Sequence, residues 1–160
     1  MLEKPQQYEA KYTLRFTDAL GNGKDGRVLK TASARAVKFF DDATVYRREL
    51  RAYQILQQRD IDELNGFQIP RLLRYDDALM AIEMTIVSPP FLLDFASAYT
   101  QHEYDRFEFT QEVLDERLAH WSDIFADDWP TVQLTSEAFT NETGLILLDL
   151  SLNNIRFAKK

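Results

Sequence analysis

The chain has 160 residues, of which 45% are apolar, so its length and composition provide for one substantial hydrophobic core rather than two. Its formal net charge is −7 at pH 7, which argues against nucleic-acid and anionic-membrane partners, because both bind mainly through cationic side chains. The lack of cysteine excludes disulfides and thiolate metal sites, and the two histidines are isolated in the sequence. The most hydrophobic stretch, residues 79–87, is short and interrupted by Glu83, so we expect a cytoplasmic protein.

The first half of the chain has the pattern of a β-sheet with one helix. Residues 43–58 have a helical pattern in which Val45, Ala52 and Leu56 lie on one apolar stripe. Five short runs favour β-strands and are separated by turn residues, namely 12–16, 27–31, 35–40, 71–75 and 79–87. We therefore predict five strands and one helix in this half.

The second half is predicted to be mainly helical. Ser88-Pro89-Pro90 interrupts regular structure, because proline cannot donate to a ladder and restricts the residue before it. We expect helices over residues 91–99, over 111–125, and from about 128 to Gly144. The chain then closes with a strand over residues 145–148, a polar bend and a second strand over 155–157.

A glycine-rich segment occupies Gly21-Asn22-Gly23-Lys24-Asp25-Gly26, with Val28 two positions further on. Glycine lets backbone amides approach a phosphate without an intervening Cβ and permits positive φ at a turn. A dinucleotide site would require a helix directly after the glycines, but residues 27–31 have a strand pattern. Taken alone, the segment is equally compatible with a glycine-rich hairpin that binds no ligand.

Lys38 lies within a predicted strand, after Ala36-Val37, where its ammonium group could meet the phosphates of a nucleotide under the glycine segment. A lysine on an exposed strand face is the alternative. Glu49 favours the first interpretation, because it lies on the apolar stripe of the following helix and has no basic residue three or four positions away. A carboxylate on a buried face needs a partner from elsewhere, and we predict that this partner is Lys38.

Asp149 and Asn154 lie five positions apart in a polar segment between two apolar runs. Oxygen ligands of this kind suit Mg²⁺, and a loop carboxylate can also orient a hydroxyl nucleophile. Turn formation is the alternative role, since Asp and Asn both favour bends. The pattern alone leaves both interpretations open.

Taken in order, these motifs resemble the protein-kinase superfamily: a glycine-rich loop, a V-A-I-K-type lysine, a pairing glutamate and a catalytic loop of the H-R-D-x-x-x-x-N type. The segments Ile69–Leu73 and Met84–Phe95 are similar to segments of small bacterial kinase-like proteins. The resemblance implies an α+β, protein-kinase-like fold in a single domain. Its N-terminal lobe, residues 11–87, would hold a five-stranded antiparallel sheet and one helix, and residues 88–160 would form a reduced helical C-terminal lobe.

The resemblance also implies that the cofactors are ATP and Mg²⁺ or Mn²⁺. The glycine loop would cover the phosphates, Lys38 would hold the α and β phosphates, and Glu49 would orient Lys38. Ile82 would be the gatekeeper beside the adenine, which would contact the backbone of Glu83 and Thr85. The residues implied to contact the nucleotide are Gly21, Gly23, Gly26, Val28, Ala36, Lys38, Ile82, Glu83 and Thr85.

For catalysis, the resemblance implies that Asp149 orients the acceptor hydroxyl and that Asn154, with Asp149, binds the metal. Leu147-Leu148 replaces the His-Arg of the family, and Ser151 replaces the usual lysine of the catalytic loop. No D-F-G, activation segment or A-P-E follows Asn154. We therefore expect the D-F-G metal ligand and the peptide-docking region to be absent from this chain, through evolution or truncation.

Three functions are compatible with these motifs. The first is ATP binding by a minimal kinase-like protein, with phosphotransfer to a hydroxyl of a protein or a small molecule. The second is a pseudokinase, an interaction module that keeps the pocket without catalysis, as the missing D-F-G aspartate suggests. The third is a structural domain in which the glycines and the lysine are coincidental.

Overall fold

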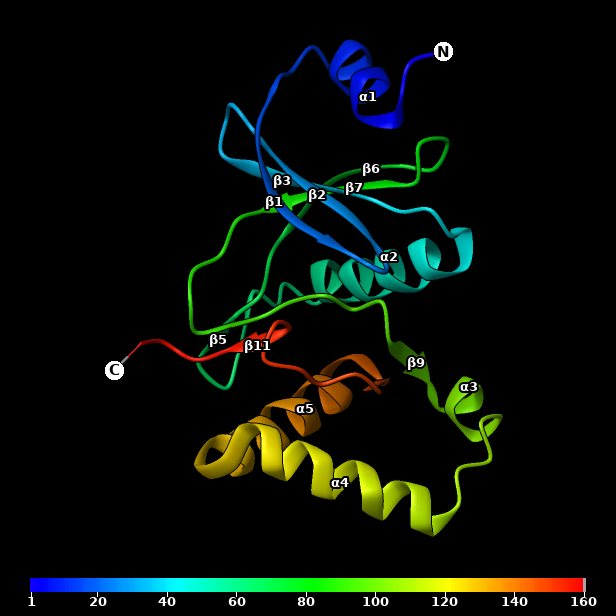
Figure 1. Cartoon of the computed structure of the whole chain (residues 1–160), viewed down its shortest axis with the longest axis vertical. Helices are drawn as coiled ribbons and strands as arrows, with labels where there is room; N and C mark the ends of the chain where they lie inside the picture. Colours follow the sequence, from blue (N-terminus) through cyan, green and yellow to red (C-terminus); the bar gives the residue numbers. More distant parts are fainter. Residues whose placement is uncertain (160) are drawn as a thin grey trace.

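An antiparallel five-stranded sheet forms the first half of the computed structural model, which describes residues 1–159 (Figure 1). The strands follow the order β1-β2-β3-β7-β6, so β7 inserts between β3 and β6. Their bounds are β1 (Phe16–Gly23), β2 (Gly26–Thr31), β3 (Arg35–Phe39), β6 (Leu72–Asp76) and β7 (Ala81–Thr85).

The two faces of this sheet pack against different helices, α1 (Lys4–Tyr12) and α2 (Ala43–Gln58). Successive side chains of a strand point to opposite faces, and the burial of β3 follows this rule. Val37 packs in one apolar cluster with Tyr8 of α1, whereas Ala36 packs in another with Tyr53 of α2. The sheet is therefore covered on both sides, and the α2 side faces the second half of the molecule (Figure 1).

The helix α2 begins where the sequence supplies an N-cap. The carboxylate of Asp42 accepts hydrogen bonds from the amides of Thr44 and Val45, at 2.8 and 2.9 Å. The apolar stripe of the helix is buried against the sheet and contains Glu49, which is 1% exposed. On another face, the Arg51 guanidinium pairs with both carboxylate oxygens of Glu103, at 2.8 and 2.9 Å, and so ties α2 to the second half.

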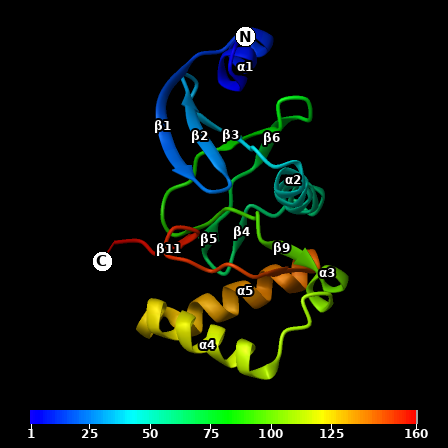
Figure 2. The ribbon, with the colours of Figure 1, turned by 45° about the vertical axis from the view of Figure 1, so that its right-hand side comes forward.

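The second half combines three α-helices with short strands (Figure 2). The strand pairs are arranged as a four-stranded sheet of order β11-β8-β5-β4 and a two-stranded sheet of β10 and β9. The elements are β4 (Glu63–Leu64), β5 (Phe67–Gln68), β8 (Phe91–Leu92), β9 (Ala98–Thr100), α3 (Gln101–Asp105), α4 (Gln111–Phe125), the 3₁₀ turn η1 (Ala126–Asp128), α5 (Trp129–Thr143), β10 (Leu145–Leu147) and β11 (Ile155–Arg156).

The pairing of these short strands brings together two segments that are far apart in the sequence. β8 pairs antiparallel with β11, and β9 pairs antiparallel with β10. The segment that joins β8 to β9 therefore lies beside the polar loop that joins β10 to β11 (Figure 1). Both segments are placed below the α2 side of the five-stranded sheet.

The predicted α+β class is confirmed, and several predicted elements are present. The helix over residues 43–58 has the predicted bounds, and α4 and α5 occupy the second and third helical segments predicted in the second half. Gly144 ends α5 with φ 73°, in the left-handed region that favours glycine. Among residues 1–159, no helix is both long and apolar enough to cross a lipid bilayer.

Two predicted elements were wrong. The expected helix over residues 91–99 is replaced by the short strands β8 and β9, because each finds a pairing partner near the C-terminal end of the chain. The expected strand over residues 12–16 is also displaced: Tyr12 ends α1, and β1 starts at Phe16 and incorporates Gly21 and Gly23. The sequence shows that these segments are apolar, but their conformation depends on pairing with strands that are distant in the sequence.

The helix α1 is held on the sheet by polar contacts as well as by packing. Tyr8 is fully buried, and its hydroxyl donates a 2.7 Å hydrogen bond to Oε2 of Glu83 on β7. Arg35 donates to the other carboxylate oxygen of Glu83 at 3.2 Å. The Lys11 ammonium and the Tyr12 hydroxyl both donate to Oδ2 of Asp76, at 2.6 and 2.7 Å. These contacts hold α1 against β6 and β7, and β7 also lines the cleft described below.

We predict that Tyr8→Phe lowers the free energy of unfolding by about 1–3 kcal/mol, because it removes a donor from the buried carboxylate of Glu83. Equilibrium unfolding in urea, followed by circular dichroism, measures the change. Tyr75→Phe is the matched control, since Tyr75 lies on β6 with 45% exposure. An equal effect of both substitutions would show that the hydrogen bond from Tyr8 contributes nothing specific.

Candidate functional site

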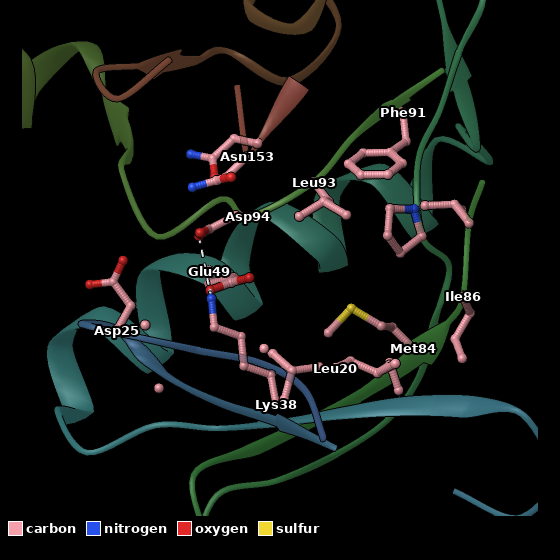
Figure 3. Close-up of a pocket in the computed structure, with 18 of the residues that line it drawn as sticks. Leu20, Asp25, Lys38, Glu49, Met84, Ile86, Phe91, Leu93, Asp94 and Asn153 are labelled. Carbon is pink, nitrogen blue, oxygen red and sulfur yellow. Dashed lines mark hydrogen bonds and ion pairs between the residues drawn. The ribbon is translucent and has the colours of Figure 1, made fainter. Parts of the chain in front are cut away.

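A cleft with a volume of about 710 Å³ lies between the five-stranded sheet and the second half of the molecule (Figure 3). Its walls come from three parts of the chain: the β1–β2 hairpin, the cleft-facing side chains of β3 and β7, and the two loops near β8 and β11. The site residues predicted from the sequence lie along these walls, with two exceptions described below.

The glycine segment forms the tip of the β1–β2 hairpin, where Gly23 pairs with Gly26 and residues 24–25 make the turn. Gly26 is buried and has φ 152°, and a Cβ there would overlap the carbonyl oxygen of Phe39 on β3. Gly21 and Gly23 differ, because a Cβ at either position would meet no described atom within 4 Å. Gly26 is therefore required by backbone packing, whereas Gly21 and Gly23 leave open space above the cleft.

The ion pair predicted between Lys38 and Glu49 is present. The Lys38 ammonium donates to Oε2 of Glu49 at 2.8 Å, and the two side chains are 8% and 1% exposed. The β3 strand supplies the lysine and the buried stripe of α2 supplies the glutamate (Figure 3). The same ammonium donates to Oδ1 of Asp94 at 3.3 Å. The roles of Lys38 and Glu49 in binding a ligand remain predictions.

Burial and charge act in opposite directions on this pair. Burial lowers the pKa of the Lys38 ammonium, but the carboxylates of Glu49 and Asp94 raise it by more, so its pKa lies above the usual value. Burial raises the pKa of the Glu49 carboxyl to about 7, against the attraction of Lys38. The cleft thus holds a cation that stays protonated at neutral pH, paired with a buried carboxyl group whose pKa is raised.

The end of the cleft away from the Lys38–Glu49 pair is apolar. Its lining includes Val28 and Ala36, as predicted, together with Met84 and Thr85 of β7. Beyond the end of β7, Ile86 and Val87 continue the wall. Further apolar side chains come from Leu20, Pro70, Phe91 and Leu93. This end could accommodate a flat aromatic group, and the ammonium of Lys38 lies toward the opposite end (Figure 3).

Two predicted contacts of β7 are arranged differently. Ile82 is fully buried in the core and does not line the cleft, where Met84 takes the place expected for it. The side chain of Glu83 points to the α1 face, where it accepts the hydrogen bond from Tyr8. The amide of Thr85 already donates to the carbonyl of Arg71 at 3.0 Å. The nearest backbone beyond the sheet is that of Ile86 and Val87.

Asp149 and Asn154 lie in the loop between β10 and β11, and both line the cleft. The loop is a tight turn in which the Asn154 amide donates to the carbonyl of Ser151 at 3.1 Å and its side chain donates to the carbonyl of Asp149 at 3.3 Å. Asn154 is 8% exposed, whereas the carboxylate of Asp149 makes no hydrogen bond or ion pair with residues 1–159. Turn formation thus accounts for the backbone of this loop and leaves the Asp149 carboxylate available.

The oxygen-bearing side chains of this loop fit a cation that is shared with a ligand. Within the described part of the chain, no group of three or more Asp, Glu, His or Cys residues forms a complete metal site. Mg²⁺ is usually bound through one or two carboxylates, with phosphate and water oxygens completing its shell. Asp149 and Asn154 could hold it in that manner only together with a phosphate ligand.

Asp94 is a cleft residue that the sequence reasoning missed. It follows the apolar run Phe91-Leu92-Leu93 and lines the cleft beside Lys38 (Figure 3). Residues 91–99 were predicted to form a helix, and within a helix nothing distinguishes this carboxylate from other polar residues. The available signal was an acidic residue directly after a short apolar run, which is also the pattern of a residue at the end of a strand.

A second cavity of about 560 Å³ adjoins the cleft and shares Asp94, Asp149 and Asn154 with it. Aromatic and basic side chains, among them those of Tyr99, Phe109, Arg48 and Arg117, form part of its remaining wall. The Arg48 guanidinium stacks over the ring of Tyr99 at 4.2 Å, and that of Arg117 stacks over the ring of Phe109 at 4.7 Å. Asp149 thus separates two cavities, one below the glycine hairpin and one beside α4.

A scan against protein-family models finds no match, and a search of curated proteins finds none either. A search of solved structures matches the ternary complex of streptomycin, ATP and APH(2'')-IIa at 13% identity, covering 74% of this chain with a TM-score of 0.42. It also matches the ADP-bound aminoglycoside phosphotransferase APH(2'')-Ib at 13% identity, covering 76% of this chain with a TM-score of 0.44. The match spans 36% of each solved chain, and overlaps of this size assign neither family nor activity.

Substitution of the hairpin glycines tests whether Gly26 and Gly23 have different structural roles. We expect Gly26→Ala to destabilise the fold by about 1–3 kcal/mol, because the added Cβ collides with backbone and the φ of the residue is unfavourable for alanine. Gly23→Ala should change the free energy of unfolding by less than about 0.5 kcal/mol, since its surroundings are open. Urea unfolding of both variants measures the difference. Similar losses in the two variants would contradict the distinct roles assigned here.

Proposed function

We propose that the chain binds ATP in a protein-kinase-like cleft and transfers the γ-phosphate to a hydroxyl group. The observation that carries this proposal is the buried ion pair between Lys38 and Glu49 beneath a glycine hairpin. A buried cation held by a carboxylate costs desolvation energy, so its retention at the wall of an open cleft favours a role toward an anionic ligand. The apolar end of the same cleft supplies a surface for adenine.

In this proposal the triphosphate lies below the hairpin, with Lys38 bound to the α and β phosphates and Glu49 orienting Lys38. The adenine lies between Val28 and Ala36 on one side and Met84 on the other. Met84 takes the gatekeeper position in place of Ile82. Because the amide of Thr85 is used within the sheet, we assign the adenine contacts to the backbone of Ile86 and Val87.

The loop between β10 and β11 carries the polar groups of the transfer step. Asp149 would orient the acceptor hydroxyl and accept its proton, since its carboxylate is free and lies between the two cavities. A bound Mg²⁺ or Mn²⁺ would neutralise negative charge on the phosphates, and Asn154 with Asp149 would hold it. The second cavity is the place where a small molecule or a protein side chain could present its hydroxyl.

The first test is whether the folded chain binds nucleotide. A ligand at a hundredfold excess over its Kd stabilises the folded state by about 2.7 kcal/mol, which corresponds to a rise in Tm of roughly 5–10 °C for a protein of this size. We expect such a rise with ATP or ADP and no rise with inorganic phosphate at equal concentration. Differential scanning fluorimetry with millimolar nucleotide measures it, and an unchanged Tm would reject the nucleotide site.

Transfer is tested separately from binding. Labelled ATP with Mg²⁺ or Mn²⁺ and a generic acceptor should give labelled product with the wild-type chain, and Asp149→Asn should lose transfer while it still binds metal-free nucleotide. Binding without transfer in the wild type would identify the alternative function, a pseudokinase that uses nucleotide as a structural ligand. Absence of both would leave a structural domain.

The third test concerns the ion pair. Lys38→Met should abolish or greatly weaken triphosphate binding, and Glu49→Gln should weaken it less, because Lys38 stays present but loses its orientation. The loss of stability in Lys38→Met should be less than the roughly 3–5 kcal/mol typical of a broken buried pair, since the raised pKa of Glu49 lets that carboxyl take up a proton. A double-mutant cycle on the ATP Kd, measured by calorimetry, should show clearly non-additive losses. Additive losses would make Lys38 an ordinary lysine of the sheet.

A further inference from the structure

Asp94 occupies a defined place in the cleft that no motif of the sequence explains. Its Oδ1 lies 3.3 Å from the Lys38 ammonium and accepts a hydrogen bond from the amide of Ala96 at 3.3 Å. The side chain is 26% exposed, and it lines both the main cleft and the adjoining cavity. One oxygen of the carboxylate is therefore engaged, while the group as a whole remains open to a ligand in the cleft.

Backbone hydrogen bonds fix the turn that carries Asp94 against the polar loop. The amide of Leu93 donates to the carbonyl of Asn154 at 2.9 Å, directly before Asp94. On the far side of the turn, Ser97 accepts from the amide of Leu148 through its carbonyl, at 3.1 Å, and from the amide of Asp149 through its hydroxyl, at 3.0 Å. These bonds, together with the pairing of β8 with β11 and β9 with β10, set Asp94 opposite Asp149 and Asn154.

Asn154 provides a second oxygen at this place. The residue is 8% exposed, its Nδ2 donates to the carbonyl of Asp149, and its Oδ1 accepts no hydrogen bond from residues 1–159. The residue lines both cavities. The Oδ1 atom therefore keeps its lone pairs available at the cleft, and a divalent cation is one ligand that such an amide oxygen can bind.

We infer that Asp94 supplies a further metal-binding carboxylate of this cleft, in addition to Asp149, and that it shares a divalent cation with Asn154 and the nucleotide phosphates. The inference rests on the proposed nucleotide site. This carboxylate comes from a segment that precedes α3, α4 and α5 in the chain. A carboxylate, an amide oxygen and phosphate oxygens are the ligand types that Mg²⁺ and Mn²⁺ prefer.

A purely structural role for Asp94 makes a different prediction. In that case its carboxylate only caps the turn at Ala96 and neutralises Lys38, and Asp94→Asn would affect stability without any dependence on metal. Asp94 has φ 69°, and asparagine tolerates this left-handed conformation well, so the substitution keeps both the shape and the backbone of the turn. Asp94→Asn is therefore the informative variant.

The experiment compares the ADP Kd with and without Mn²⁺ by calorimetry, in the wild type, in Asp94→Asn and in the control Asp18→Asn. Asp18 lies on the exposed part of β1, so the control removes the same charge away from the cleft. We expect Mn²⁺ to strengthen ADP binding in the wild type and in Asp18→Asn. In Asp94→Asn the ratio of the ADP Kd without Mn²⁺ to the ADP Kd with Mn²⁺ should fall by at least about tenfold.

A measurement on the wild-type chain tests the same assignment of Asp94 without any substitution. In a ¹⁵N-labelled sample, Mn²⁺ with ADP should broaden the amide signals of Leu93 to Ala96 together with those of Asn153 and Asn154. An intact Mn²⁺ gain in Asp94→Asn, or no broadening of these signals by Mn²⁺ with ADP, would overturn the assignment of Asp94 while leaving the nucleotide site in place. No binding of ADP by the wild type under any condition would overturn both.

Discussion

The ion pair between Lys38 and Glu49 joins the sheet to α2, and the shape of the cleft depends on it. Both groups are nearly excluded from water, so each charge is held close to the other, and this restricts where the two backbone elements can lie. The lysine is held below the hairpin, and α2 is held with its buried stripe against the sheet. The strand, the helix and the hairpin therefore form one unit around a fixed cation.

The same lysine connects this unit to the second half of the molecule through Asp94. A second connection is the bidentate pair of Arg51 with Glu103, in which the guanidinium also donates to the carbonyl of Ala98 at 3.0 Å. The guanidinium holds the pKa of the Glu103 carboxyl far below its usual value, at about 2, so the pair stays charged at any physiological pH. Polar contacts thus set the position of the lower wall of the cleft relative to α2.

The opposite face of the sheet has a complementary role. There α1 covers β3 and β7, and the buried carboxylate of Glu83 is satisfied by Tyr8 and Arg35. Because neighbouring residues of β7 point to opposite faces, the same strand presents Met84 to the cleft and Glu83 to α1. The carboxylates of Glu49 and Glu83 thus have separate partners on the two faces of the sheet.

The sequence by itself determined the features that depend on local spacing. The periodicity of residues 43–58 predicted α2, and the carboxylate of Glu49 on its apolar stripe predicted Lys38 as a partner. Only the tertiary structure decided the conformation of residues 91–100. Strands of two and three residues form only where a segment distant in the sequence pairs with them. The tertiary structure also decided that Met84 rather than Ile82 faces the cleft, and that Asp94 meets Lys38. These contacts join residues whose separation in the chain carries no periodic signal, so only the packed fold brings them together.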